Sequence, residues 1–88
     1  MAYKFVLTKQ AAGDLRNMDR TTARRIIKKL MWFQKQANPL LFAKRLREPA
    51  AGDIRFRVGD IRLIALINEK QKRIEIVRIG HRRDVYLS

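Results

Sequence analysis

Hydrophobic and polar residues alternate most regularly in the middle of the chain. Over Ile54–Val58 every second side chain is apolar and the two between are arginines, which is the period of a strand with one buried face. Gly59 follows, paired with Asp60, and glycine at the first position of a two-residue link supplies the positive φ of a type II′ turn. The pattern therefore predicts a β-hairpin whose second strand covers Ile61–Ile67.

The two-residue turn also determines which side chains of the hairpin lie opposite each other. Counting back from the turn places Arg57 directly opposite Arg62, with Arg55 two positions along the same face. Like charges so placed destabilise a strand pair by a few tenths of a kcal/mol, up to about 1 kcal/mol. The planar guanidinium group suits phosphate oxygens. The three arginines favour an anion site on this face, whereas simple solvation of an exposed sheet face is the alternative.

A strand and two helices are predicted before the hairpin. Tyr3–Leu7 alternates like a strand, Thr8 can cap a short helix to about Asn17, and Asp19 can cap a longer helix to about Ala37. The two helices should form an antiparallel hairpin packed on the sheet. The longer helix has a stripe of apolar residues with the i, i+3, i+4, i+7 spacing, namely Ala23, Ile26, Ile27, Leu30, Phe33 and Ala37.

The segment Leu40–Gly52 is interpreted as a connector, with a short helical turn over Leu41–Leu46 as an option. It carries three basic residues that can either follow a phosphate backbone or solvate a loop, namely Lys44, Arg45 and Arg47. Just before it, Trp32 lies off the apolar stripe and resembles a base-stacking residue. Packing at the edge of the helix–sheet interface is the preferred interpretation of this tryptophan.

A third strand after the hairpin is predicted over Arg73–Ile79. If Ile67 pairs with Arg73, then Arg78 lies beside Arg62 and lengthens the row of arginines. A shift of one residue would reverse its face. These elements together predict an α+β fold in which the first strand and the helix hairpin pack on a mainly antiparallel sheet, completed by a three-strand meander.

Charge is the most informative part of the composition. The 88 residues include 21 Lys and Arg against 8 Asp and Glu, a formal net charge of +13. Such an excess indicates a polyanionic partner, either nucleic acid or an acidic protein. The chain has no cysteine and one histidine, so we expect neither a metal site nor a cofactor. We expect one domain over residues 1–88, no membrane partner and a cytoplasmic location.

Groups able to exchange protons gather near the C-terminus. His81 has an ordinary pKa near 6.5 and can act as an acid or base near neutrality. Tyr86 can stack on a base or pass a proton, and Arg82 and Arg83 can neutralise a phosphate. A structural histidine, a tyrosine that closes the core and solvated arginines are the alternatives for each residue singly. Their grouping after a strand next to the arginines favours a functional site.

Two stretches of the sequence carry a family resemblance. Ile54–Ile64, with its arginines and Gly-Asp turn, and Ile79–Tyr86 resemble the RelE/ParE superfamily of toxins from prokaryotic toxin–antitoxin pairs. The predicted order of strand, helix hairpin and meander also fits this superfamily. The pattern G-H-R-x-x-V-Y in the second stretch is similar to the RelE branch rather than to the gyrase-directed ParE branch.

This resemblance implies an endoribonuclease that cuts messenger RNA in the ribosomal A site. In RelE-like toxins the ribose 2′-hydroxyl attacks the adjacent phosphate without a metal. Arg55 and Arg57 then correspond to residues that contact the scissile phosphate, and Arg62 and Arg82 to catalytic arginines that stabilise charge. Tyr86 corresponds to the tyrosine that stacks on a base. Further RNA contacts are expected from Lys44, Arg45, Arg47, Arg78 and Arg83.

The general base of this reaction is a departure from the family pattern. Some members carry lysines where Arg55 and Arg57 stand, and an arginine with a pKa above 12 cannot accept a proton. His81 is the favoured base, with Tyr86 or the ribosomal RNA as alternatives.

The expected partners are messenger RNA, the ribosome and a cognate antitoxin with an acidic segment, in a hetero-oligomeric complex. Three other functions are compatible with the residues. The protein can be a ParE-like inhibitor of DNA gyrase that cleaves nothing, a basic module that only binds RNA, or an inert toxin.

Overall fold

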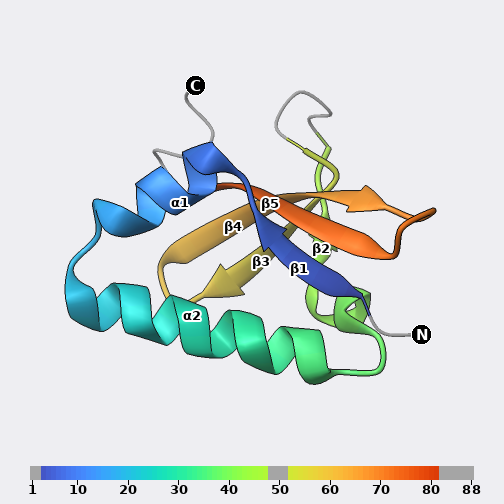
Figure 1. The fold of residues 1–88 in the computed structure, drawn as a ribbon, viewed down its shortest axis with the longest axis horizontal. Helices are drawn as coiled ribbons and strands as arrows, with labels where there is room; N and C mark the ends of the chain where they lie inside the picture. The colour runs from blue at the N-terminus through green and yellow to red at the C-terminus, as the bar shows by residue number, and fades with distance from the viewer. Residues whose placement is uncertain (1–2, 48–51, 82–88) are drawn as a thin grey trace.

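Two helices pack on a five-stranded mixed sheet in the computed structural model, which describes residues 3–47 and 52–81 (Figure 1). The strand order is β1-β5-β4-β3-β2, with β1 parallel to β5 and every other pair antiparallel. This arrangement confirms the predicted α+β class. The elements are β1 (Lys4–Leu7), α1 (Lys9–Arg16), α2 (Arg20–Lys35), the 3-10 helix η1 (Pro39–Phe42), β2 (Lys44–Arg45), β3 (Ile54–Val58), β4 (Ile61–Asn68) and β5 (Arg73–His81).

The central hairpin of β3 and β4 has the predicted register. Val58 is opposite Ile61, and Arg57 is therefore opposite Arg62. Gly59 has a φ of 60°, the positive value that the first position of a type II′ turn requires. The turn sequence thus decides which residues of the hairpin share a face.

The register between β4 and β5 differs from the predicted one. Arg73 pairs with Asn68 rather than with the preceding residue, and a bulge in the pairing after Ile64 then adds one residue to β5. As a result Arg78 lies opposite Ile64, and the prediction that it lies beside Arg62 is wrong. The shifted register alone would place Arg78 on the core side of the sheet, because side chains alternate along a strand. The extra residue of the bulge returns Arg78 to the side of Arg62.

The helices begin where their capping residues predict. The Thr8 side chain accepts a hydrogen bond from the backbone N–H of Ala11, and Asp19 accepts one from that of Thr22. Hydrogen bonds from Thr22 lower the pKa of Asp19 below its ordinary value. Helix α2 ends at Lys35, two residues earlier than predicted. None of the helices in the described part of the chain is long and apolar enough to cross a membrane.

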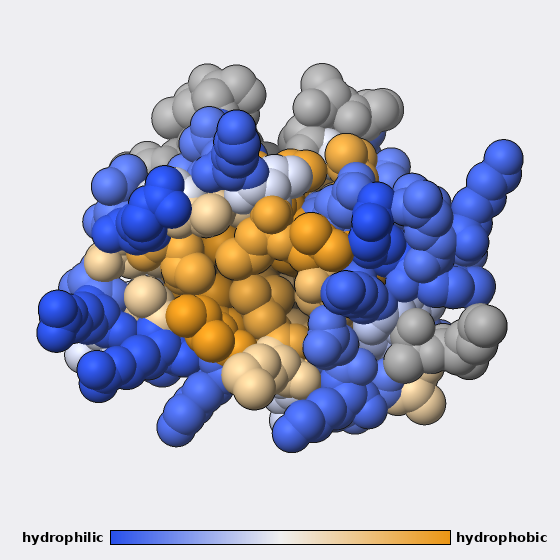
Figure 2. All heavy atoms as spheres, in the orientation of Figure 1, coloured by the Kyte–Doolittle hydropathy of each residue, from blue (hydrophilic) through white to orange (hydrophobic). Residues whose placement is uncertain are grey.

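The core lies between α2 and the sheet. Ile26 and Phe33 of α2 are buried against Phe56 of β3 and Leu63 of β4. The apolar stripe of α2 is only partly covered, since Ile27 is 44% exposed. Figure 2 shows the apolar surface that this leaves between α2 and β1, where the structure has a hollow of about 190 Å³.

Helix α1 covers the edge of β5 beyond the end of β1 (Figure 1). The Asp14 carboxylate accepts a hydrogen bond of 2.9 Å from the backbone N–H of Ile79. The same oxygen lies 3.3 Å from Nε of Arg78. Asp14 therefore satisfies a strand edge and binds the arginine beside the bulge.

The connector after α2 contains structure that was not predicted. The helical turn begins earlier, at Pro39, because the Asn38 side chain accepts a hydrogen bond of 3.2 Å from the N–H of Leu40. The predicted connector residues Lys44 and Arg45 form β2, which pairs with the start of β3. Two residues carry no detectable period, so this strand depends on the free edge of β3 rather than on its own sequence.

Candidate functional site

Four cations lie on the sheet face opposite α2. Arg57 is opposite Arg62, while Arg55 shares their face and is opposite Lys44 of β2. We call this group, Lys44, Arg55, Arg57 and Arg62, the arginine face. The hairpin turn and the pairing of β2 bring these four residues together. The predicted placement of Arg55, Arg57 and Arg62 on one face is confirmed, and Lys44 joins them through a strand that was not predicted.

The residues of the arginine face differ in exposure. Arg62 is 7% exposed, and its Nη1 donates a hydrogen bond of 3.4 Å to the Gly59 carbonyl, which holds the guanidinium near the turn. Arg57 and Lys44 are exposed. Lys44, Arg55 and Arg57 line a hollow of about 240 Å³ together with Phe42. One buried and fixed guanidinium beside exposed cations suits a bound anion.

No carboxylate lines the hollow of the arginine face among the described residues. In the same part of the chain, ion pairs form between Asp14 and Arg78, Glu69 and Lys72, and Glu75 and Arg73. Arg57 and Lys44 form no ion pair within residues 3–47 and 52–81. Their charge is therefore available to a ligand.

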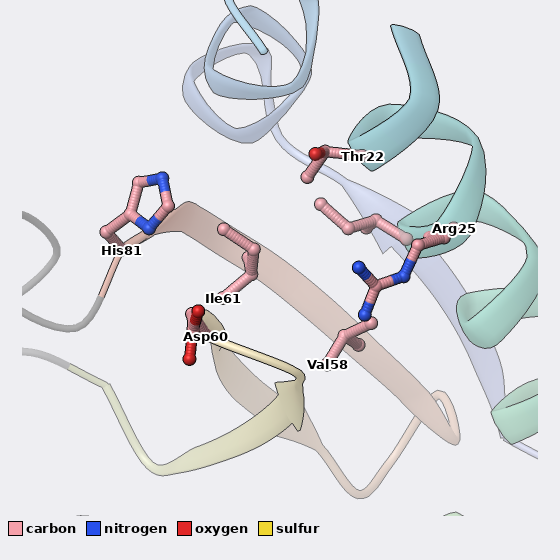
Figure 3. Close-up of a pocket in the computed structure, with 7 residues that line it drawn as sticks. Thr22, Arg25, Val58, Asp60, Ile61 and His81 are labelled. Atoms are coloured by element: carbon pink, nitrogen blue, oxygen red, sulfur yellow. The ribbon is translucent and has the colours of Figure 1, made fainter. Parts of the chain in front are cut away.

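The structure does not bring His81 together with the arginine face. His81 is opposite Ile61, whose side chain belongs to the core on the α2 side of the sheet. It lines a small pocket of about 90 Å³ with Arg25 of α2 and Asp60 of the turn (Figure 3). His81 of β5 thus points to the helix side of the sheet, whereas Arg57 of β3 and Arg62 of β4 point to the opposite side.

The remaining predicted site residues are distributed as follows. Arg45 is opposite Ile54 and therefore points to the same side of the sheet as the core, although it is exposed because β2 is an edge strand. Arg47 is exposed beyond β2, and Arg78 shares the facing of the arginine face but is bound to Asp14. The predictions for Arg82, Arg83 and Tyr86 lie outside the residues that the structure describes.

Sequence reasoning missed a second basic surface, on α2. Arg25, Lys28 and Lys29 line a wide hollow of about 510 Å³ with Trp32 and, from β3, Arg57. The signal was present in the sequence, since positions 25, 28, 29 and 32 follow the i, i+3, i+4, i+7 spacing of one helix face. The apolar stripe of the same helix is the more prominent pattern, and these four residues lie off it.

Comparisons with known proteins agree with this fold. They define the class of the protein as the toxin of a type II toxin–antitoxin system. The model of the ParE toxin of the type II toxin–antitoxin system parDE matches residues 5–86. The chain belongs to this family, and so to the RelE/ParE superfamily that the sequence resembles. No curated protein matches the chain.

Several solved structures are similar to this one. The toxin–antitoxin complex RelBE2 from Mycobacterium tuberculosis contains a chain with 25% identity and a TM-score of 0.80, covering 93% of this chain and 100% of that one. The RelE–RelB complex from Pyrococcus horikoshii gives 26% identity and a TM-score of 0.71, covering 96% and 99%. A mutant of the Escherichia coli toxin RelE in the free state is 22% identical with a TM-score of 0.69, and the match covers 98% of this chain and 92% of that one. At this identity the likeness supports the shared fold and nothing further.

Proposed function

We propose that the protein is a ribosome-dependent endoribonuclease that cleaves messenger RNA and so inhibits translation. The observation that carries this proposal is the arginine face, where Arg55 and Arg57 line a hollow that no described carboxylate lines, and Arg62 lies opposite Arg57. Solved RelE-type toxins with a similar fold support it. The guanidinium and ammonium groups on this face suit a phosphodiester better than a neutral or cationic ligand.

In the proposed reaction the ribose 2′-oxygen attacks the adjacent phosphorus. The bond from phosphorus to the 2′-oxygen forms as the bond to the 5′-oxygen breaks, and the departing 5′-oxygen takes up a proton from water, which leaves a 2′,3′-cyclic phosphate and a 5′-hydroxyl. Negative charge grows on the phosphoryl oxygens, and the fixed Arg62 guanidinium stabilises it more in the transition state than in the ground state. Loss of one such donor costs roughly 3–4 kcal/mol of barrier.

Proton transfer in this reaction needs a group other than the arginines, whose pKa is too high. The sequence favours His81 as the base, but its position on the helix side of the sheet argues against that role. Tyr86 or a group of the ribosomal RNA then accepts the proton from the 2′-hydroxyl. A toxin that lacks a complete base of its own should act poorly on free RNA, which is consistent with dependence on the ribosome.

Primer extension on a defined messenger RNA, with and without programmed ribosomes, tests the proposal. The first comparison is Arg57→Gln against Arg45→Gln, because both residues are exposed arginines on paired strands but face opposite sides of the sheet. We expect ribosome-dependent cuts from the wild type and the Arg45 variant, and at least a hundredfold slower cutting, as for the loss of a preorganised donor, from the Arg57 variant. Arg62→Ala and Tyr86→Phe should also lose cutting.

A second candidate function is inhibition of DNA gyrase, because the family model that matches the chain carries the ParE name. Intact messenger RNA from a protein that still arrests growth would reject the nuclease, and loss of gyrase supercoiling activity on adding the protein would then support this candidate. For a gyrase inhibitor, Tyr86→Phe should leave toxicity unchanged whatever the effect of Arg57→Gln, whereas for the nuclease both variants should lose toxicity.

The partner expected in either case is an antitoxin, since the similar structures include toxin–antitoxin complexes. We propose that an acidic segment of that antitoxin covers the arginine face, because complementary charge favours this contact. Arg57→Gln should then weaken the complex more than Arg45→Gln does, when binding to the antitoxin is measured by calorimetry at several salt concentrations.

A further inference from the structure

Two basic hollows in the described part of the chain meet at one residue. Arg57 lines the hollow of the arginine face with Phe42 and Lys44, and it also lines the hollow of α2 with Trp32. We call the combined surface the edge track. It consists of Arg25, Lys28, Lys29 and Trp32 of α2, Phe42 of η1, Lys44 of β2, and Arg55 and Arg57 of β3.

The shortness of β2 explains how this surface passes around the sheet. β2 pairs with Ile54 and Arg55, so among the described residues the rest of β3 has no neighbouring strand on that side. Arg57 lies in this open stretch and its long side chain is exposed. A ligand on the arginine face can therefore continue past the edge of β3 to α2.

The chemistry of the edge track combines cations with aromatic rings. Six of its side chains are Lys or Arg, and no carboxylate lines either hollow among the described residues. Trp32 is 41% exposed and Phe42 is 46% exposed, with ring centroids 4.9 Å apart at 71°. The Lys29 ammonium lies 4.2 Å from the Trp32 ring centroid.

This combination is typical of surfaces that bind single-stranded nucleic acid. Cations follow the phosphates, and exposed rings stack on bases irrespective of sequence. An acidic protein segment would use the cations but has no need of two exposed rings beside them. Trp32 also packs on Phe33 and Phe42 at the edge of the helix–sheet interface, as predicted, so the exposed part of its ring is held rigidly.

We propose that the edge track binds a single strand of RNA that continues from the arginine face around β3 to α2, with a base stacked on Trp32. The inference rests on the proposed function for the identity of the polymer. It adds a binding path on α2 that lies outside the arginine face. A base that stacks on the ring where Lys29 now lies would release the ammonium to a phosphate.

Trp32 is the single tryptophan of the chain, so its fluorescence reports on this site directly. The probe is an eight-nucleotide oligouridylate with 2′-O-methyl groups, which cannot be cleaved by 2′-hydroxyl attack. We expect it to quench Trp32 fluorescence in the free protein. With a fluorescein-labelled probe, anisotropy should show about a 5- to 150-fold weaker affinity for Trp32→Ala, and a smaller loss for Trp32→Phe.

Salt dependence measures the contribution of the α2 lysines. Each phosphate contact on a single strand contributes a slope of about −0.7 in log K against log salt concentration. The double variant Lys28→Gln with Lys29→Gln should therefore reduce the slope by about 1.4. The matched control, Lys9→Gln with Lys70→Gln, removes two exposed lysines outside the track and should leave both slope and quenching unchanged.

Three outcomes would overturn the proposal: no quenching of Trp32, an α2 double variant that binds like the control, or equal quenching by poly-glutamate, which would indicate an acidic protein partner. Primer extension separates this proposal from the nuclease. If the α2 variants bind RNA like the wild type while the protein cleaves messenger RNA on the ribosome, the edge track is rejected and the nuclease is retained. If the probe quenches Trp32 with the expected salt slopes but the protein cuts nothing, the nuclease is rejected and the edge track is retained.

Discussion

At the scale of single residues, the opposed pair Arg57 and Arg62 shows a conflict between stability and binding. Both belong to one face of the β3–β4 hairpin, and opposed like charges destabilise a strand pair. The short turn at Gly59 fixes this opposition, so the repulsion cannot be relieved by a change of register. A bound anion would relieve it.

The first prediction follows from this repulsion. Arg57→Thr removes one of the opposed charges and supplies a good strand former, so it should raise the free energy of unfolding by a few tenths of a kcal/mol, up to about 1 kcal/mol. Urea denaturation with an unchanged m-value measures this. Arg45→Thr, whose residue is opposite the uncharged Ile54, should change stability less. A destabilised Arg57→Thr protein would show that the arginine has favourable contacts that outweigh the repulsion.

Two glycines make a second prediction at this scale. Gly52 has a φ of 144°, and a Cβ there would lie 2.7 Å from Cγ2 of buried Ile64, so Gly52→Ala should destabilise the protein by about 1–3 kcal/mol. Gly13 lies inside α1, where a Cβ would make an ordinary contact of 3.8 Å with Nη2 of Arg16, and Gly13→Ala should stabilise the protein by up to about 1 kcal/mol. Thermal denaturation of both variants compares them. Similar shifts in both would contradict the structure around Gly52.

At the scale of elements, α1 is attached to the sheet through one carboxylate. Asp14 of α1 accepts hydrogen bonds from the backbone of Ile79 and from Arg78, both in β5 past the end of β1. The strand edge would otherwise present a free N–H. One side chain thus links helix position, edge protection and the orientation of an arginine.

The third prediction tests this attachment. Asp14→Ala leaves the N–H of Ile79 without its acceptor and should cost about 2 kcal/mol of unfolding free energy, within the range for hydrogen bonds to charged groups. Hydrogen exchange should show faster exchange at the Ile79 amide than at amides in the β3–β4 hairpin. Asp60→Ala, which removes an exposed carboxylate in the turn, is the control. Unchanged protection at Ile79 would contradict the attachment.

The sequence predicted those elements whose determinants are local. The β3–β4 hairpin and the opposition of its arginines follow from alternation and one glycine, and the helix starts follow from Thr8 and Asp19. β2 and the bulge in β5 were missed because they depend on contacts with neighbouring strands. Neither the alternation pattern nor the capping residues predicted the position of His81, because one inserted residue in β5 decides which face the later residues take.

At the scale of the whole molecule, a net charge of +13 is confined to a body of 33 × 27 × 22 Å. The screening length is about 10 Å at 0.1 M salt, so charges on neighbouring elements repel each other at low ionic strength. Most of the positive charge has no ion pair within the described residues to offset it. The free protein should therefore be destabilised by its own surface.

The fourth prediction is that salt stabilises the free protein. Raising sodium chloride from about 0.01 M to 0.3 M shortens the screening length severalfold and should raise Tm. The uncleavable oligouridylate should raise Tm further at low salt, because a ligand that binds only the folded state stabilises it. Differential scanning fluorimetry checks both effects. A Tm independent of salt would show that the like charges are too far apart to interact.

The bulge in β5 has a consequence for how chains of this kind tolerate insertions and deletions. Removing the extra residue between Ile76 and Arg78 would leave a regularly alternating strand in which Ile74, Ile76 and Ile79 all still face the core. Removing a residue from a regular part of β5 would instead turn the residues on one side of the deletion to the opposite face, because side chains alternate there. Single-residue deletions in β5 should therefore be tolerated at the bulge and not elsewhere in the strand.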